Sequence, residues 1–191
     1  VDLPKVLLLG DSIRMSYQPI VSELLFDMAV VVGPTDNCRY SLYTLSSLDR
    51  WMTDLGPPDV VHWNNGLHDS GHDPKRSPVQ MPVAMYCANL AFILDRLIAM
   101  TPRVIWASST PIHPDRPFLN NEWSWRNEEI AEYNAAAREL LEKRGVLIND
   151  LHQLVWNDLS TLGDDHLHLS EHGQRVCAGA VAAAVSAALP E

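Results

Sequence analysis

The sequence Val6-Leu7-Leu8-Leu9-Gly10-Asp11-Ser12 is an apolar run that stops at a glycine and is followed two residues later by a serine. Four consecutive apolar residues predict a strand that is buried on both faces, which is typical of a parallel sheet covered by helices. Gly10 permits a sharp turn, and an amphipathic segment begins shortly afterwards. Ser12 is therefore expected at a strand-to-helix corner, beyond the carboxyl end of the strand, where open parallel sheets bind ligands.

Ser12 has two interpretations at this corner. Serine is a favoured helix N-cap, and it is also a common nucleophile. A distant segment, Gly163-Asp164-Asp165-His166-Leu167-His168, favours the nucleophile. Asp165 and His168 are three residues apart, which is close enough for the carboxylate to accept a hydrogen bond from one imidazole nitrogen while the other faces Ser12. Asp164 is the rival partner for this imidazole.

Strands and helices are expected to alternate along the whole chain. Beyond the first strand, apolar runs predict strands at 29–32, 59–63, 103–107 and 146–148. Periodic segments predict helices at 19–28, 41–55, 83–100, 126–144 and 151–158. A last helix is expected to follow Ser170, its N-cap, and to run to about residue 189. This alternation indicates βαβ units and an α/β fold, with the sheet between two helical layers in a three-layer αβα sandwich. The length of 191 residues suits a single domain spanning 1–191. Loops that follow the strands should converge on one pocket.

Composition excludes several classes of function. The chain has 14 Lys and Arg against 24 Asp and Glu, a formal charge of −10, whereas nucleic-acid binders need a positive surface. The longest uncharged apolar stretch, 176–190, is short and rich in alanine, so a membrane span is not expected. Three widely spaced cysteines argue against a disulfide framework. No secretory leader opens the sequence, and a cytoplasmic location is therefore expected.

Two motifs at opposite ends of the chain resemble those of the SGNH, or GDSL-type, hydrolase superfamily. Gly10-Asp11-Ser12 is similar to its nucleophile block, and Asp165-His166-Leu167-His168 is similar to its Asp-x-x-His block. The resemblance implies a flavodoxin-like, five-stranded parallel sheet in the order 2-1-3-4-5. It also implies a serine esterase in which Ser12 is the nucleophile, His168 the general base and Asp165 its partner, with no metal or cofactor.

The chain departs from this family pattern in two blocks. The third block is usually Gly-x-Asn-Asp, with the asparagine donating to the oxyanion, and here Gly66-Leu67-His68-Asp69 places a histidine there. An imidazole N–H can donate as an amide does, so His68 is the expected substitute, with Asn64 or Asn65 as alternatives. The glycine of the second block corresponds to Cys38. The predicted oxyanion hole therefore consists of the backbone N–H groups of Ser12 and Cys38 and the side chain of His68.

Other polar and aromatic residues are candidates for binding substrate or metal. Aromatic faces stack on sugar rings and arginines hold carboxylates, so the substrate-binding candidates are Trp123, Trp125, Arg116 and Arg126, together with Asn37, Asn65 and Asp69 from the converging loops. Trp123 and Trp125 have a second interpretation, as core residues of a loop that closes over the sheet edge. His166, His168, His172 and Asp165 form a dense cluster, but no zinc-binding spacing is present, so no metal site is expected.

These observations predict a carboxylic ester hydrolase that acts on small acyl esters. Carbohydrate O-deacetylation is the favoured reaction, and the expected partner is a small-molecule or glycan ester. A lipid esterase or thioesterase on the same scaffold is the nearest alternative. A sugar-binding protein without hydrolytic activity is the alternative from a different class, because His68 interrupts the usual third block.

Overall fold

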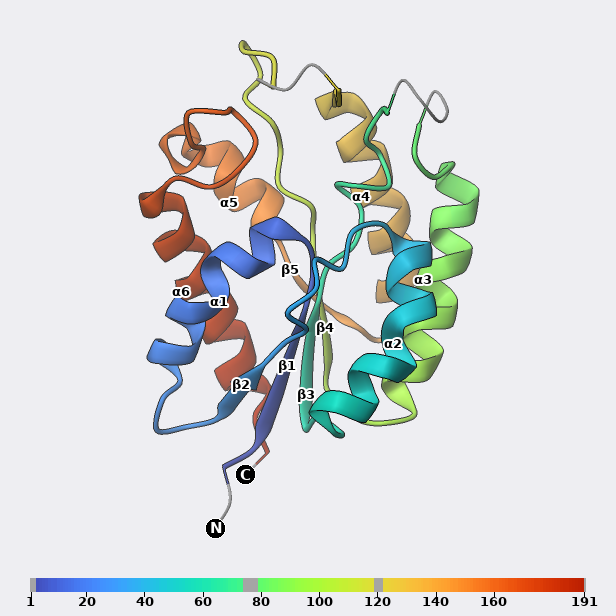
Figure 1. Ribbon diagram of the computed structural model, residues 1–191, viewed down its shortest axis with the longest axis vertical. Helices are drawn as coiled ribbons and strands as arrows, with labels where there is room; N and C mark the ends of the chain where they lie inside the picture. Colours follow the sequence, from blue (N-terminus) through green and yellow to red (C-terminus); the bar gives the residue numbers. More distant parts are fainter. Residues whose placement is uncertain (1–2, 74–78, 119–121, 191) are drawn as a thin grey trace.

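Five parallel strands form one sheet in the order β2-β1-β3-β4-β5 (Figure 1). The computed structural model describes residues 3–73, 79–118 and 122–190. Its strands are β1 (Lys5–Leu9), β2 (Val30–Val32), β3 (Val60–Trp63), β4 (Val104–Ala107) and β5 (Leu147–Asn149). The strand order and the parallel pairing confirm the fold class that the sequence predicts.

The central strands are apolar on both faces because each face carries a layer of helices. Val6 and Leu8 of β1 pack into one core cluster, whereas Leu7 and Leu9 pack into the other. All four side chains are at most 1% exposed. This alternation follows from the two-residue period of a strand, and it explains why the run carries no polar residue.

Helices cover the two faces of the sheet in separate groups (Figure 1). One face carries α1 (Ser12–Leu24), α5 (Leu151–Asn157) and α6 (Glu171–Ala188), and the other carries α2 (Ser41–Leu55), α3 (Val83–Ile98) and α4 (Asn127–Glu142). A 3-10 turn, Leu159–Thr161, joins α5 to the loop before α6. The result is the expected three-layer sandwich. Within the described part of the chain, no helix is long and apolar enough to cross a membrane.

Helix α1 begins earlier than the sequence analysis predicts. The expected helix spanned 19–28, but the observed one starts at Ser12, because the Asp11 carboxylate accepts a hydrogen bond from the backbone N–H of Ile13 at 2.9 Å and caps the helix. The buried face is formed by Ile13, Tyr17 and Val21, whereas Met28 lies beyond the helix and is exposed. Ser12 is therefore the first residue of α1 and not its N-cap.

Helix α6 brings the end of the chain to its beginning. The hydroxyl of Ser170 accepts a hydrogen bond from the Gly173 N–H at 3.1 Å, which confirms the predicted N-cap. From there α6 packs along α1. The loop at 163–169, which precedes Ser170, is consequently held beside the first turn of α1, where Ser12 lies.

Candidate active site

Ser12, His168 and Asp165 form a continuous chain of hydrogen bonds. The Oγ atom of Ser12 lies 2.9 Å from Nε2 of His168, and Nδ1 of the same ring lies 2.5 Å from Oδ2 of Asp165. The nucleophile candidate comes from the first turn of α1 and the other two residues come from the loop before α6. The structure therefore brings together the three residues that the two terminal motifs predict.

Asp165 is fixed by its own loop. Its Oδ1 atom accepts hydrogen bonds from the backbone N–H groups of Leu167 at 3.0 Å and His168 at 2.8 Å. Burial alone would raise the pKa of Asp165, but the hydrogen bonds from the His168 ring and from these two N–H groups hold that pKa below its usual value. The carboxylate is thus ionised and orients the imidazole. Asp164, the alternative partner, is exposed.

The neighbouring histidines have separate partners. His166 adopts a left-handed backbone conformation (φ 70°), and its Nδ1 atom lies 2.9 Å from the carbonyl oxygen of Pro117. His172 Nε2 lies 3.0 Å from Oδ2 of Asp158. Among the residues that the structure describes, no three histidine, cysteine or acidic side chains come together as a metal site.

The backbone N–H of Ser12 is one available donor at this site. It lies in the first helical turn, where N–H groups have no intrahelical acceptor. The ring of His68 is a second, because it lines the pocket that opens beside Ser12 and His168 and makes no hydrogen bond to a described residue. Its ring meets that of Trp123 edge-on, with centroids 5.9 Å apart.

His68 is held in its neutral form. Burial lowers the pKa of the ring, and the nearby Arg39 and His168 side chains lower it further, against the opposing effect of Asp11. A neutral imidazole keeps one N–H, so His68 retains a donor for a developing negative charge.

Cys38 does not supply the donor that the sequence analysis assigned to it. Its backbone N–H donates to the carbonyl oxygen of Gly10 at 3.1 Å, and its side chain is fully buried, which raises the pKa of the thiol to about 11. The residue of this loop that lines the pocket is Asn37. Its Oδ1 atom accepts from the N–H of Arg39 at 2.8 Å, and Arg39 has a positive φ of 52°. This reversal of the chain turns Cys38 inward.

Asn64 and Asn65, the alternatives to His68, are both engaged elsewhere. Asn64 Nδ2 donates to the carbonyl oxygen of Ala107 at 2.7 Å. Asn65 is buried, and its Nδ2 donates to the Arg39 carbonyl at 3.1 Å and to Thr44 Oγ1 at 2.9 Å. Neither amide faces the pocket with a free donor. Asn65 is therefore not the substrate-binding residue that was expected, and instead ties two loops together.

Asp69 is likewise an internal residue, contrary to expectation. Its side chain is fully buried, and its carboxylate accepts hydrogen bonds from the Ser41 N–H at 2.9 and 3.0 Å and from the Ser41 hydroxyl at 2.5 Å. Burial raises the pKa of Asp69 to about 7, although the bonds from Ser41 oppose this. The N-cap residue of α2, Tyr40, has no side-chain cap, so Asp69 performs that task from the neighbouring loop.

A pocket of about 320 Å³ opens beside Ser12 and His168. It is lined by Ser12, Asn37, Leu67, His68, Phe118, Trp123, Trp125, Leu167 and His168. The two indoles stack with centroids 5.6 Å apart and an interplanar angle of 15°. Trp125 Nε1 donates to the carbonyl oxygen of Leu67 at 2.6 Å, and this bond fixes the indole pair to the His68 loop.

The predicted arginines lie away from this pocket. Arg116 is exposed and does not line it. Arg126 is also exposed and pairs with Glu129, with Nη1 and Oε1 3.2 Å apart. Three lining residues were not selected by the sequence analysis: Leu67, Phe118 and Leu167. Leu67 and Leu167 immediately precede His68 and His168, and this position next to predicted site residues is the signal that would have found them.

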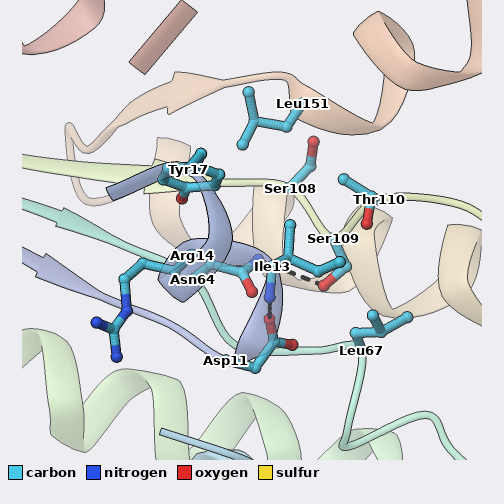
Figure 2. Close-up of a pocket in the computed structure, with 10 residues that line it drawn as sticks. All are labelled: Asp11, Ile13, Arg14, Tyr17, Asn64, Leu67, Ser108, Ser109, Thr110 and Leu151. Atoms are coloured by element: carbon cyan, nitrogen blue, oxygen red, sulfur yellow. Dashed lines mark hydrogen bonds between the residues drawn. The ribbon is translucent and has the colours of Figure 1, made fainter. Parts of the chain in front are cut away.

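A second, much smaller cavity lies behind the first turn of α1 (Figure 2). Its volume of about 10 Å³ matches a single water molecule. Asp11, Asn64 and Thr110 are among the residues that line it. The hydroxyl of Thr110 is buried and has no hydrogen-bond partner among the described residues.

Comparisons with solved structures show the same fold in known esterases. An acetyl xylan esterase, AlAXEase, superimposes with a TM-score of 0.78 at 18% identity, covering 95% of this chain and 99% of the other. Axe2, an acetylxylan esterase from Geobacillus stearothermophilus, gives 0.78 at 17% identity, with 96% and 94% covered. A lipase/acylhydrolase from Enterococcus faecalis gives 0.78 at 20% identity, with 98% of each chain covered. A search of curated proteins found no match.

A protein-family model gives the assignment. The model of the GDSL-like Lipase/Acylhydrolase family matches residues 32–176, a range that contains His68, Asp165 and His168 and begins after Ser12. The match spans more than half of the 191 residues. The chain therefore belongs to the GDSL-like lipase/acylhydrolase family and is a carboxylic ester hydrolase.

Proposed function

We propose that this protein is a serine esterase that removes small acyl groups, acetyl above all, from carbohydrates. The observation that carries the proposal is the hydrogen-bonded chain from Ser12 Oγ through the His168 ring to Asp165, which opens onto a pocket walled by aromatic side chains. This arrangement matches the geometry that an acyl-transfer triad requires.

The reaction follows from the positions of these atoms. Ser12 Oγ attacks the ester carbonyl while His168 Nε2 takes its proton, and Asp165 holds the Nδ1–H tautomer and stabilises the imidazolium that forms. The negative oxygen is stabilised by the Ser12 N–H and the His68 ring. His168 then returns the proton to the leaving alkoxide. A water molecule activated by the same nitrogen releases the acid from Ser12.

Asn37 is the further donor that we propose for the oxyanion, in place of Cys38. It is the residue of its loop that lines the pocket. Its Oδ1 atom is turned toward the Arg39 N–H, and its Nδ2 group makes no hydrogen bond to a described residue. The side-chain amide is therefore available where the backbone N–H of Cys38 is not.

The dimensions and walls of the pocket support a small, ring-shaped substrate. A volume of about 320 Å³ lies at the lower end of the roughly 300–1,000 Å³ range of small-molecule sites. The stacked indoles of Trp123 and Trp125 present aromatic surface of the kind on which sugar rings pack. The names of AlAXEase and Axe2 describe acetyl xylan esterases, which makes an acetylated glycan the first substrate to test.

A lipid esterase or thioesterase is the second candidate. The favouring observation is the apolar wall that Leu67, Phe118 and Leu167 give the pocket. Rates on p-nitrophenyl esters of increasing chain length separate the two candidates. We expect the acetyl ester to be hydrolysed fastest, and a maximum at octanoate would favour the lipid substrate.

The direct test is release of acetate from acetylated oligosaccharides by the wild type and by Ser12→Ala. The matched control is Ser16→Ala, because Ser16 lies in the same helix and, among the described residues, its hydroxyl bonds only to the Ile13 carbonyl, at 2.7 Å. We expect Ser12→Ala to lose turnover and Ser16→Ala to keep it. Sugar binding without hydrolysis by the wild type would identify a non-catalytic relative and refute the esterase proposal.

A further inference from the structure

Arg14 is a charged residue inside the protein, two positions after Ser12. Its exposure is only 3%. The guanidinium group donates to the Gly10 carbonyl from Nε at 3.3 Å and from Nη2 at 3.2 Å. It also donates to the Pro34 carbonyl at 3.0 Å and to the Asp36 carbonyl at 2.9 Å. Four of its hydrogen bonds therefore end on backbone oxygens.

The hydrogen-bond acceptors of this guanidinium, among the described residues, are all neutral groups. Among the described residues, no carboxylate forms an ion pair with Arg14, and its only oxygen acceptor from a side chain is Gln18 Oε1, at 2.8 Å. A buried charge that is compensated only by dipoles is a poor way to gain stability, because desolvation costs more than such bonds return. Local rules of this kind are broken mainly where a site needs a particular geometry.

The backbone oxygens that Arg14 binds come from two segments beside the pocket. Gly10 lies in the turn that precedes Ser12, whereas Pro34 and Asp36 lie in the loop that leads to Asn37. Arg14 is among the residues that line the small cavity, and Figure 2 shows its side chain extending away from Ser108 and Thr110. Its donors instead connect these two segments to each other.

Gly33 provides independent evidence that this loop is built around the guanidinium. A Cβ atom at this position would lie 3.1 Å from Arg14 Nη1, 2.4 Å from Gln18 Oε1 and 2.8 Å from the Leu8 carbonyl. Only glycine lets the chain pass so close. The loop that leads to Asn37 is therefore in contact with the Arg14 guanidinium from its first residues.

We propose that Arg14 is a positioning residue of the ester hydrolysis, which holds the 34–38 loop against the turn before Ser12 and so sets Asn37 opposite the reacting carbonyl. The inference rests on the proposed serine-esterase function. Arg14 itself does not touch the substrate. It acts through the loop, and a shift of about 1 Å in a positioned donor can cost about a hundredfold in rate.

The test compares Arg14→Met, which keeps the bulk and loses all donors, with Arg14→Lys, which keeps the charge. Ile93→Val is the control for stability, because Ile93 is fully buried in α3 on the other face of the sheet. The readouts are kcat and KM on p-nitrophenyl acetate, thermal stability, and inhibition by methylboronic acid, which forms a tetrahedral adduct with a serine hydroxyl.

We expect Arg14→Met to lower kcat by roughly 10- to 100-fold with little change in KM, and to weaken boronate inhibition by a similar factor. Arg14→Lys should remain impaired, because a single ammonium cannot bridge both segments as the planar guanidinium does. If Arg14→Met does not fold, Gln18→Leu removes one acceptor of the guanidinium and should lower kcat by a smaller factor, about 2- to 5-fold.

The outcomes separate this inference from the proposed function. Arg14 has only a structural role if Arg14→Met or Arg14→Lys keeps the wild-type kcat and boronate affinity and loses thermal stability as Ile93→Val does. Wild-type kcat in Gln18→Leu would overturn the inference in the same way if Arg14→Met cannot be made. A wild type without hydrolytic activity would refute the serine esterase and the role of Arg14 together.

Discussion

His68 is the side chain that we propose as a donor to the negative oxygen. An imidazole that burial keeps neutral donates through one ring N–H, and its orientation is set by the edge-on contact with Trp123. The donor is therefore built into the aromatic wall of the pocket. This arrangement differs from a carboxamide donor, which would not pack on an indole in the same way.

Replacing His68 tests this assignment. His68→Ala should lower kcat by about 10²–10³, the usual cost of removing one oxyanion donor, and leave thermal stability nearly unchanged. His68→Asn should recover part of the rate, because an amide can donate from a similar position. The measurement is kcat on p-nitrophenyl acetate. Full activity in His68→Ala would show that the oxyanion donors lie elsewhere.

The two adjacent carboxylates at 164 and 165 should differ sharply in effect. Asp165→Asn presents an amide to His168 Nδ1, favours the wrong tautomer and should lower kcat by about 10⁴. Asp164→Asn removes an exposed charge and should change kcat by less than about twofold, as surface substitutions usually do. Equal losses in steady-state assays would contradict the assignment of Asp165.

Residue-level prediction was correct for the contacts among Ser12, His168 and Asp165. Asp165 and His168 stand in one short motif whose spacing indicates their contact, and Ser12 stands in a second motif at the other end of the chain. Cys38 was assigned wrongly because the direction of a backbone N–H depends on the local turn, here on the positive φ of Arg39. Arg14 was missed because a charged residue in an amphipathic helix is normally exposed, and its acceptors lie up to 22 positions away.

Among the secondary-structure elements, α6 offers a matched pair of glycines. A Cβ atom on Gly173 would lie 2.0 Å from the Thr161 carbonyl oxygen, whereas one on Gly179 would meet nothing within 4 Å. Gly173 is therefore the residue at which α6 packs closely against the backbone of Thr161, in the segment that leads to the Asp165 loop. Gly179 is an ordinary helix position with glycine's conformational freedom.

Alanine at the two positions should have opposite effects. Gly173→Ala should destabilise the fold and lower kcat, because the clash displaces the 161–170 segment that carries His168. Gly179→Ala should stabilise the protein by about 0.5–1 kcal/mol without changing kcat. Urea unfolding and ester hydrolysis measure both effects. A Gly173→Ala variant with unaltered stability and rate would mean that the contact is easily relieved.

Element boundaries were predicted well where burial is unambiguous. The strands were recognised from apolar runs because both faces of the sheet are covered, and α6 was recognised from its cap at Ser170. The start of α1 was placed late because Arg14, Ser16 and Gln18 dilute the apolar periodicity of its first turns. Its buried face, Ile13, Tyr17 and Val21, is regular once Asp11 is seen as the cap.

For the whole molecule, His62 links the stability of the sheet to pH. The ring lies fully buried on β3, and its Nε2 atom is 3.1 Å from Asn149 Nδ2 on β5. Burial lowers the pKa of His62 from 6.5 to about 4. The unfolded chain therefore binds this proton more readily than the folded one. The contribution of His62 to the free energy of unfolding is complete above pH 6.5 and is lost as the pH falls toward 4.

Between pH 7 and pH 4, we expect the free energy of unfolding of the wild type to fall by on the order of 3 kcal/mol through His62, at 1.36 kcal/mol per pKa unit. His62→Gln should not show this loss, because glutamine does not titrate. Urea unfolding at several pH values measures the difference. Parallel pH profiles for His62→Gln and the wild type would show that His62 does not titrate in this range.

At this scale the strand order was predicted from family resemblance and not from periodicity. Apolar runs indicate how many buried strands exist, but neighbours within the sheet depend on crossovers that leave no local pattern. The meeting of Ser12 with His168 follows from that topology, because α6 returns along α1.

The stacked pair of Trp123 and Trp125 gives the pocket a built-in optical reporter. The two indoles line the pocket together with His68, whereas Trp63 and Trp106 are fully buried in the core. Occupation by a saccharide should therefore change the emission of Trp123 and Trp125, while the emission of the two core indoles stays constant. Fluorescence titration of Ser12→Ala would report ligand affinity directly, with no label and no turnover.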